Sequence, residues 1–311
     1  MVFSMLFLVL FALSTVYGIP SLIVYLYVIH VLIRDRSIFH SWFYKFFVIN
    51  GILDCCDIII QTLFDRIPFN GLFVSFYRNL PHFLVTVCFF FKYFHLYAHF
   101  IGSFVVGVNR FYAIVVPEHH HTVMVNRVLN WLSVCLIFCP SLGITVQLLY
   151  LGAEYVPFDE DRPDASLIMK YNNNNNTALP NFRNSENAVY LISVVAVLSL
   201  LFNGITLFFI IRTRAQVLST KDKNLRKAEF NLFSASMMIF SFELLMVAYQ
   251  AIALARPNDD RVLFVLSSIY PLVYDACMLT PPWILLATSA TVRQQVILAH
   301  RLFIRRQTSS S

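Results

Sequence analysis

Five charged side chains lie inside long apolar segments, and they are the residues of this sequence best suited to functional chemistry. They are Asp54, Asp57, Lys92, Glu243 and Asp275. Because a charge is costly to place in hydrocarbon, such residues usually face the interior of a helix bundle, where they pair and mark a functional site. Asp54 and Asp57 are three residues apart and share one helix face. They predict a buried polar network; the alternative is a network that only holds helices together.

Two of these charges are expected to meet directly. Counted from the ends of their apolar segments, Asp57 and Lys92 lie at a similar depth, so a buried ion pair would help both to stay charged. His95 and His99, one helical turn apart, are predicted to join the network. A metal site is the alternative, but the histidines at 119–121 would lie roughly 30 Å from His95 at about 1.5 Å per residue. Since metal ligands must gather at one place, we predict no metal site.

Motifs for cofactors and phosphates are absent from the sequence. It contains no HExxH, no GxGxxG and no GxxxxGK[ST]. Gly102 and Gly107 have the spacing of the phosphate loop, but Val108 and Asn109 follow them. We therefore expect no cofactor and no enzymatic activity.

The composition excludes a single soluble domain. Of 311 residues, 58% are apolar and 13% are charged, whereas a soluble domain carries about 25% charged residues. The same numbers argue against nucleic-acid binding. All six cysteines lie in apolar segments, which argues against a disulfide framework and favours small buried side chains. The bilayer is therefore the expected solvent.

The elements that must position the charged residues are seven apolar segments. Each is long enough to cross about 30 Å of hydrocarbon, which takes about 20 helical residues, and each should be helical because unpaired backbone groups are costly in lipid. We predict an all-α, polytopic seven-transmembrane helix bundle in one domain, residues 1–290. The spans are residues 6–33, 43–64, 83–108, 128–151, 189–211, 230–255 and 262–286.

The two ends of the chain carry further signals. The first span is interpreted as a complete helix kinked around Gly18 and Pro20, because no basic residue precedes it as in a signal peptide. In the tail, residues 291–311, apolar residues recur at helical spacing from Val292 to Phe303 with arginines on another face. This pattern predicts an amphipathic helix on the inner membrane surface; an ordinary basic tail is the alternative.

The distribution of basic residues predicts the orientation. With the N-terminus outside, fifteen of the 23 Lys and Arg residues fall in inner segments and seven in outer ones, as the positive-inside rule requires. The longest outer loop, residues 152–188, is polar and is expected to be flexible. In it, Asn175 begins an Asn-Asn-Thr glycosylation sequon, although a run of asparagines also produces such a triplet by chance.

Several short motifs resemble nematode serpentine chemoreceptors, particularly serpentine receptor class gamma, within the G-protein-coupled receptor superfamily. The motifs are Tyr17-Gly-Ile-Pro-Ser21 in the first span, Asn109-Arg110-Phe111-Tyr112 with Pro117 after the third, and Pro281-Pro282-Trp283 in the seventh. The resemblance covers nearly the whole chain. It implies a multi-pass plasma-membrane receptor of sensory neurons that binds an external chemical ligand and signals to an intracellular heterotrimeric G protein.

The resemblance also implies roles for single residues. Arg110 matches the arginine that switches between an intramolecular tether and the G protein, and Asn109 and Phe111 flank it. Asn109 replaces the usual acidic neighbour, residues 152–188 lack the cysteine of the rhodopsin-like clamp, and Pro-Pro-Trp replaces Asn-Pro-x-x-Tyr. These departures argue against a rhodopsin-like activation mechanism. An alternative function is a ligand-gated channel or a transporter whose carboxylates line a pathway.

Overall fold

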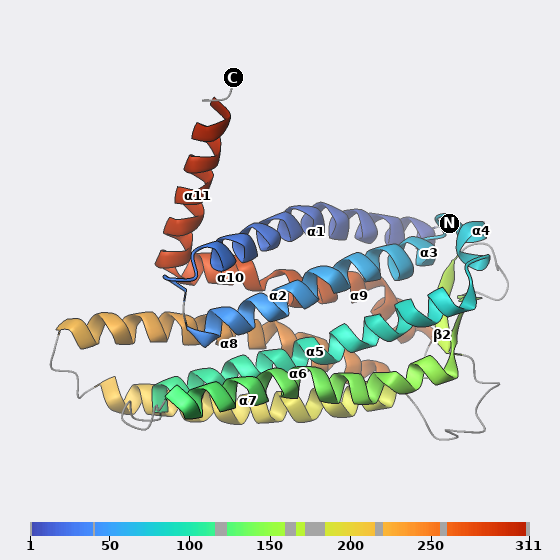
Figure 1. Cartoon of the computed structure of the whole chain (residues 1–311). Helices are drawn as coiled ribbons and strands as arrows, with labels where there is room; N and C mark the ends of the chain where they lie inside the picture. The colour runs from blue at the N-terminus through green and yellow to red at the C-terminus, as the bar shows by residue number, and fades with distance from the viewer. Residues whose placement is uncertain are drawn as a thin grey trace.

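The computed structural model describes residues 2–39, 41–115, 123–158, 166–171, 184–214, 220–255 and 260–308. The described part is a bundle of long helices (Figure 1). The long helices are α1 (Val2–Arg34), α2 (Trp42–Gln61), α5 (His82–Val115), α6 (Val123–Leu151), α7 (Asn184–Arg214), α8 (Thr220–Ala255), α9 (Asp260–Leu279) and α11 (Ala290–Thr308). The shorter ones are η1 (Thr62–Arg66), α3 (Ile67–Phe69), α4 (Val74–Arg78) and α10 (Pro281–Thr288).

The predicted seven-transmembrane bundle is confirmed. Among the described residues, six helical stretches are long and apolar enough to cross a membrane, and a bent pair of helices makes the seventh. The bent pair is Val265–Leu279 and Pro281–Thr288, which meet at 42°. Pro281 and Pro282 cause the break because they lack the N–H groups that would continue the helical hydrogen bonds. By contrast, α1 remains helical through Pro20.

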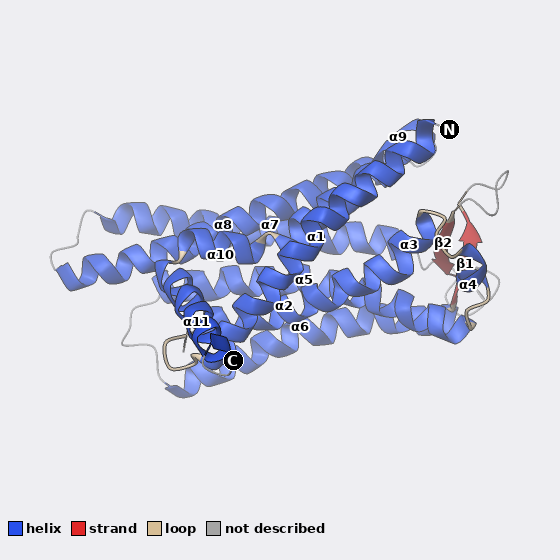
Figure 2. Cartoon of the chain, turned by 90° about the horizontal axis from the view of Figure 1, so that it is seen from above, coloured by secondary structure: helices blue, strands red, loops and turns tan. Residues whose placement is uncertain are grey.

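A β-hairpin corrects the prediction for the loop at 152–188. Its first part is not a flexible loop but two antiparallel strands, β1 (Ala153–Pro157) and β2 (Leu167–Tyr171). The Ala153 N–H donates to Thr86 Oγ1 at 2.9 Å, which ties β1 to α5. We call this end of the bundle the hairpin end, and the end where α11 begins the tail end. Figure 2 shows both ends from a second direction.

Tyr155 holds the hairpin against η1 and α4, the short helices that follow α2. Its hydroxyl donates to the Phe64 carbonyl at 2.6 Å, and its ring packs edge-on against Tyr77 with centroids 5.5 Å apart. Burial raises the pKa of the Tyr155 hydroxyl, so the group stays a donor at physiological pH. The hairpin is thus a fixed part of this end of the bundle.

Helix α5 lies at the centre of the bundle and packs against α2, α6, α7 and α8. Its buried face includes Tyr97, Ala98 and Phe100. Two glycines bring helices close together: a Cβ on Gly51 of α2 would collide with Tyr25 of α1, and one on Gly102 of α5 would collide with the side chain of Asn50. The bundle therefore places α1, α2 and α5 side by side at mid-length, where most of the predicted charged residues lie.

The tail forms the predicted helix. In α11, Val292 and Ala299 are buried, whereas Arg293 and Arg301 are exposed. The Tyr27 hydroxyl of α1 donates to the Val296 carbonyl at 3.3 Å. Figure 1 shows α11 pointing away from the bundle at the tail end. Its first turns rest their apolar side on α1, and Arg293 and Arg301 face outward.

Candidate functional site

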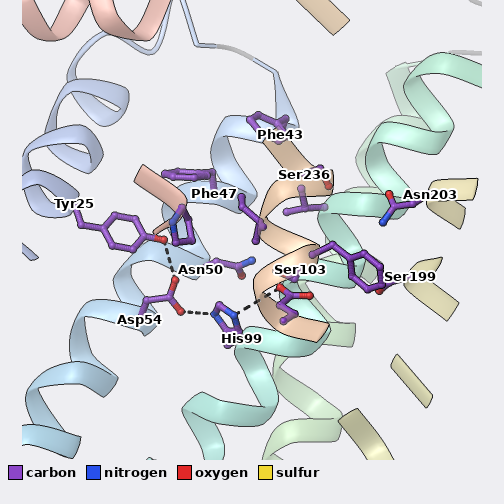
Figure 3. Close-up of a pocket in the computed structure, with 15 residues that line it drawn as sticks. Tyr25, Phe43, Phe47, Asn50, Asp54, His99, Ser103, Ser199, Asn203 and Ser236 are labelled. Atoms are coloured by element: carbon purple, nitrogen blue, oxygen red, sulfur yellow. Dashed lines mark hydrogen bonds and ion pairs between the residues drawn. The ribbon is translucent and has the colours of Figure 1, made fainter. Parts of the chain in front are cut away.

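A buried chain of three polar side chains crosses the middle of the bundle. The Tyr25 hydroxyl of α1 donates to Asp54 Oδ2 at 2.8 Å, and Asp54 Oδ1 of α2 lies 2.6 Å from His99 Nδ1 of α5. All three side chains are almost fully buried, and Figure 3 shows them in line. A buried carboxylate next to an imidazole can keep its charge only if the partners stay in place, so this chain couples the positions of three helices.

The second nitrogen of His99 extends the chain to two more helices. His99 Nε2 lies 3.7 Å from Glu243 Oε1 of α8 and 3.7 Å from the Cys277 sulfur of α9. Glu243 and Cys277 are both buried. The side chains of three other helices therefore meet at the His99 imidazole, and Tyr25 of α1 joins a fifth helix to the network through Asp54.

Asp57 does not pair with Lys92, so the predicted ion pair is wrong. The Tyr274 hydroxyl of α9 donates to Asp57 Oδ2, and His95 Nδ1 lies 3.9 Å from Asp57 Oδ1. Lys92 Nζ instead lies 2.8 Å from Asp65 Oδ1. Asp65 lies closer to the hairpin end than Asp57, and the helical segment that follows α2 directs the Asp65 carboxylate toward α5.

That helical segment is η1, a π-helical turn. The Ile67 N–H donates to the carbonyl of Thr62, five residues earlier, rather than four as in an α-helix. The wider turn changes the direction of the side chains that follow. It brings Asp65 toward Lys92 and Arg66 into the bundle, where only 7% of Arg66 is exposed.

Arg66 makes the closest ion pair among the described residues. Its Nη2 lies 2.5 Å from Asp275 Oδ1 and its Nη1 donates to Asp275 Oδ2 at 3.0 Å. Nη1 also donates to Ser14 Oγ at 2.7 Å, and the Ser14 hydroxyl donates to Asp275. Asp275 thus has the buried partner that its position requires, and the pair links η1, α9 and α1.

Asp65 and Arg66 are not among the predicted site residues, because the predicted second span ends at residue 64 and Arg66 then falls in an outer loop. One signal could have found them. The apolar residues resume directly after the two charges, at Ile67 and Pro68, so an apolar stretch continues through them. Tyr25 and Tyr274 carried no signal, because buried tyrosines are common in helix bundles.

A small polar cavity lies beside His99, on the tail side of the network. It is lined by Asn50, Ser103, Asn203, Ser236 and other residues of α2, α5, α7 and α8, together with Tyr25 of α1 and Pro281 of α10. Its volume is about 30 Å³, which is room for one or two water molecules. A drug-sized ligand needs roughly 300–1,000 Å³. In this packing the cavity is therefore a place for water between α2, α5, α7 and α8.

Arg110 lies near the tail end of α5, buried between α5 and α2. Its guanidinium sits 4.6 Å from the centre of the Phe43 ring, and its Nη2 donates to Ser41 Oγ at 3.4 Å. Phe111 packs edge-on against Phe202 of α7 at 5.2 Å between centroids. Next to Arg110, the Asn109 side chain is partly buried. Asn109, Arg110 and Phe111, which are predicted to face a signalling partner, thus lie at the tail end, and Arg110 is buried.

Two motifs distant in the sequence contact each other across α1 and the bend before α10. The Tyr17 hydroxyl and Thr280 Oγ1 are 3.1 Å apart, and the Trp283 indole N–H donates to Ser21 Oγ at 3.0 Å. Thr280 lies at the 42° bend and Trp283 lies just beyond it in α10, so α1 holds the seventh span at its break.

Other predicted features have no structural test. No cluster of three or more His, Cys, Asp or Glu side chains is placed to hold a metal ion within the described ranges. Asn175 and the histidines at 119–121 lie outside the described residues.

The comparisons with known proteins agree with this architecture. None of the curated proteins matches the chain. The model of one family, described as serpentine type 7TM GPCR chemoreceptor Srv, matches residues 14–302. The resemblance to serpentine chemoreceptors is therefore confirmed, although class gamma in particular is not. The matched region holds the polar network, Arg110 and the start of α11, and it covers most of the sequence: the chain belongs to the serpentine 7TM GPCR chemoreceptor family Srv.

Proposed function

We propose that this protein is a plasma-membrane chemosensory receptor that binds a small external chemical near the hairpin end and activates a heterotrimeric G protein at the tail end. The observation that carries the proposal is the buried network around His99, which joins five helices midway between the two ends. A family of seven-helix chemoreceptors supports the same direction of signalling. The N-terminus is outside in this proposal, and sensory neurons are the expected site of expression.

The network is suited to a switch between two packings. Each buried charge is stable only with its partner, so a helix cannot move slightly without breaking a contact. A ligand shifts such an equilibrium only by binding one packing better than the other. Among the described ion pairs at the hairpin end, Lys92–Asp65 is the most accessible: 15% of the Lys92 side chain and 21% of the Asp65 side chain are exposed. We infer that ligand contacts reach the network through this pair.

The output is proposed to be the release of Arg110. In the present packing its guanidinium lies over Phe43 and donates to Ser41, the residue that caps α2. These contacts are weaker than an ion pair, because Ser41 is neutral and the hydrogen bond is long. Because Asn109 adds no negative charge beside Arg110, we expect measurable G-protein activation without any ligand.

The substitution Arg110→Lys tests this proposal. A lysine keeps the charge but not the planar fork of donors, so ligand-independent G-protein activation in cultured cells should fall at least several-fold at matched surface density. The matched control is Arg212→Lys, an exposed arginine at the end of α7, which should signal like the wild type. Unchanged activation in Arg110→Lys would remove Arg110 from the output.

Membrane current recorded in the same cells tests the alternative. A channel or transporter would conduct when all G-protein signalling is blocked, and a panel of small polar chemicals can be screened in both assays. Current that persists under this blockade would contradict the receptor proposal. Chemically evoked G-protein activation without such current would support it.

A further inference from the structure

A second, larger hollow lies on the outside of the bundle at the tail end. It has a volume of about 590 Å³ and is lined by the end of α1, the start of α2 and the neighbouring part of α6. No described residue of α7, α8 or α9 lines it, so it is a surface groove separate from the cavity beside His99. Its size is that of a binding site for a small organic molecule or a lipid.

The groove changes character along the axis of the bundle. Toward mid-membrane it is lined by apolar side chains, among them Leu32 of α1, Val48 of α2 and Val134 of α6. Toward the tail end it is lined by Arg36 and Lys45, both exposed. Lys45 lies three residues before Val48, or about 5 Å nearer the tail end at the rise of an α-helix. A ligand that fits has a long apolar part and an anionic end.

Two tryptophans stand where the polar and apolar parts meet. Lys45 Nζ lies 4.0 Å from the centre of the Trp42 ring, which fixes the ammonium at the mouth of the groove. Trp131 on the α6 wall is 63% exposed. Tryptophan prefers the level of lipid headgroups, so these rings place Arg36 and Lys45 at that level. Among the described residues, neither cation makes an ion pair.

We propose that this groove binds one anionic phospholipid from the leaflet at the tail end, with its phosphate between Arg36 and Lys45 and an acyl chain along Val48 and Val134. Arg36 and Lys45 have no carboxylate partner among the described residues, and they face a surface at which anionic lipids concentrate. Their positive charge therefore selects an anionic occupant. A zwitterionic lipid binds Arg36 and Lys45 less favourably, because the positive charge of its headgroup is repelled by the two side chains. The bound lipid would fix the loop between α1 and α2, which also carries Ser41, the partner of Arg110.

The test uses the full-length protein in nanodiscs of phosphatidylcholine with increasing phosphatidylserine, with bound lipid read by native mass spectrometry. Each basic side chain near an anionic surface is worth a factor of about five in affinity. The double variant Arg36→Gln/Lys45→Gln should therefore bind phosphatidylserine about thirtyfold more weakly. Trp131→Ala should weaken binding of both lipids. Equal unfolding temperatures in pure phosphatidylcholine would show that the variants are folded.

A matched double variant separates the groove from general basic charge. Arg212→Gln/Arg301→Gln removes two exposed arginines near the tail end that do not line the groove, and it should keep wild-type binding. Equal losses in both double variants would overturn the proposal in favour of diffuse attraction. Competition by soluble glycerophosphoserine would overturn it in favour of a simple phosphate site. A sterol that occupies the groove equally well in the Arg36→Gln/Lys45→Gln variant would show that the occupant is not an anionic lipid.

Discussion

Arg66 and Asp275 show how this chain keeps a full charge stable in the bundle. The guanidinium meets the carboxylate through two nitrogens, at 2.5 and 3.0 Å, and Ser14 contacts both partners. Such a two-point contact needs the planar fork of arginine. The pair stabilises the fold only as a complete unit, because either ion alone would be left without a partner in a low-dielectric interior.

The substitutions Arg66→Met and Asp275→Leu test this dependence. Each should destabilise the protein by about 3–5 kcal/mol, since it strands the partner's charge. The double variant should be less destabilised than the sum of the two, because no stranded charge remains. Unfolding temperature of the purified protein and surface density in cells measure the effect. Arg212→Met, at an exposed arginine near the end of α7, is the control; additive losses in the double variant would contradict the pairing.

The buried acids could be predicted from the sequence, but their partners could not. Asp54, Asp57 and Glu243 are conspicuous because each interrupts a long apolar segment. Which groups they meet depends on how each helix is rotated and on local changes in helical geometry. Lys92 illustrates this: depth alone favoured Asp57, whereas the π-helical turn presents Asp65.

The distance between neighbouring helices depends on glycines, which have no Cβ atom. A Cβ on Gly51 would lie 2.6 Å from Tyr25 Cε2 and 2.9 Å from Ile29 Cδ1. The Tyr25 ring cannot move far, since it is fully packed and its hydroxyl bonds Asp54. The glycine therefore sets the distance between α1 and α2 at the level of the polar network.

The substitution Gly51→Ala should push these two helices apart. Overpacking of this kind costs about 1–3 kcal/mol, and here it should also weaken the contact between Tyr25 and Asp54. Gly143→Ala on α6 is the matched control, because no atom lies within 4 Å of the added Cβ and alanine favours a helix by up to about 1 kcal/mol. Thermal unfolding in detergent should separate the two variants. Equal unfolding temperatures would mean that α1 and α2 do not approach as closely as the structure has them.

Most elements follow from the sequence because hydrocarbon permits few alternatives. An apolar segment of more than 20 residues must satisfy its backbone internally, so a helix is nearly the only choice. The exceptions are elements outside this constraint. The β-hairpin depends on the Ala153 contact with Thr86 and on Tyr155 contacting Phe64, and such long-range contacts leave no periodic pattern. The bend at Pro281 was visible as a motif, but not its angle.

The orientation of the molecule in the membrane rests on a different argument from its packing. An odd number of spans places the two termini on opposite sides, and Figures 1 and 2 show the N-terminus at the hairpin end and the C-terminus on α11 at the tail end. The packing would be the same in either orientation. Basic residues break this symmetry, because they are retained in the cytoplasm during insertion. The exposed Arg36, Lys45, Arg212 and Arg301 are all near the tail end, which predicts that this end is cytoplasmic.

Epitope tags at the two termini test this orientation. In intact cells an antibody should reach an N-terminal tag, whereas a C-terminal tag should be stained only after the membrane is permeabilised. The sequon at Asn175 provides an independent measurement, since glycosylation occurs only on the luminal side; removal of a glycan by Asn175→Gln should lower the apparent mass of the protein. A C-terminal tag stained in intact cells would reverse the orientation. It would then place Arg110 and the lipid groove on the external side, where neither a G protein nor the anionic inner leaflet could reach them.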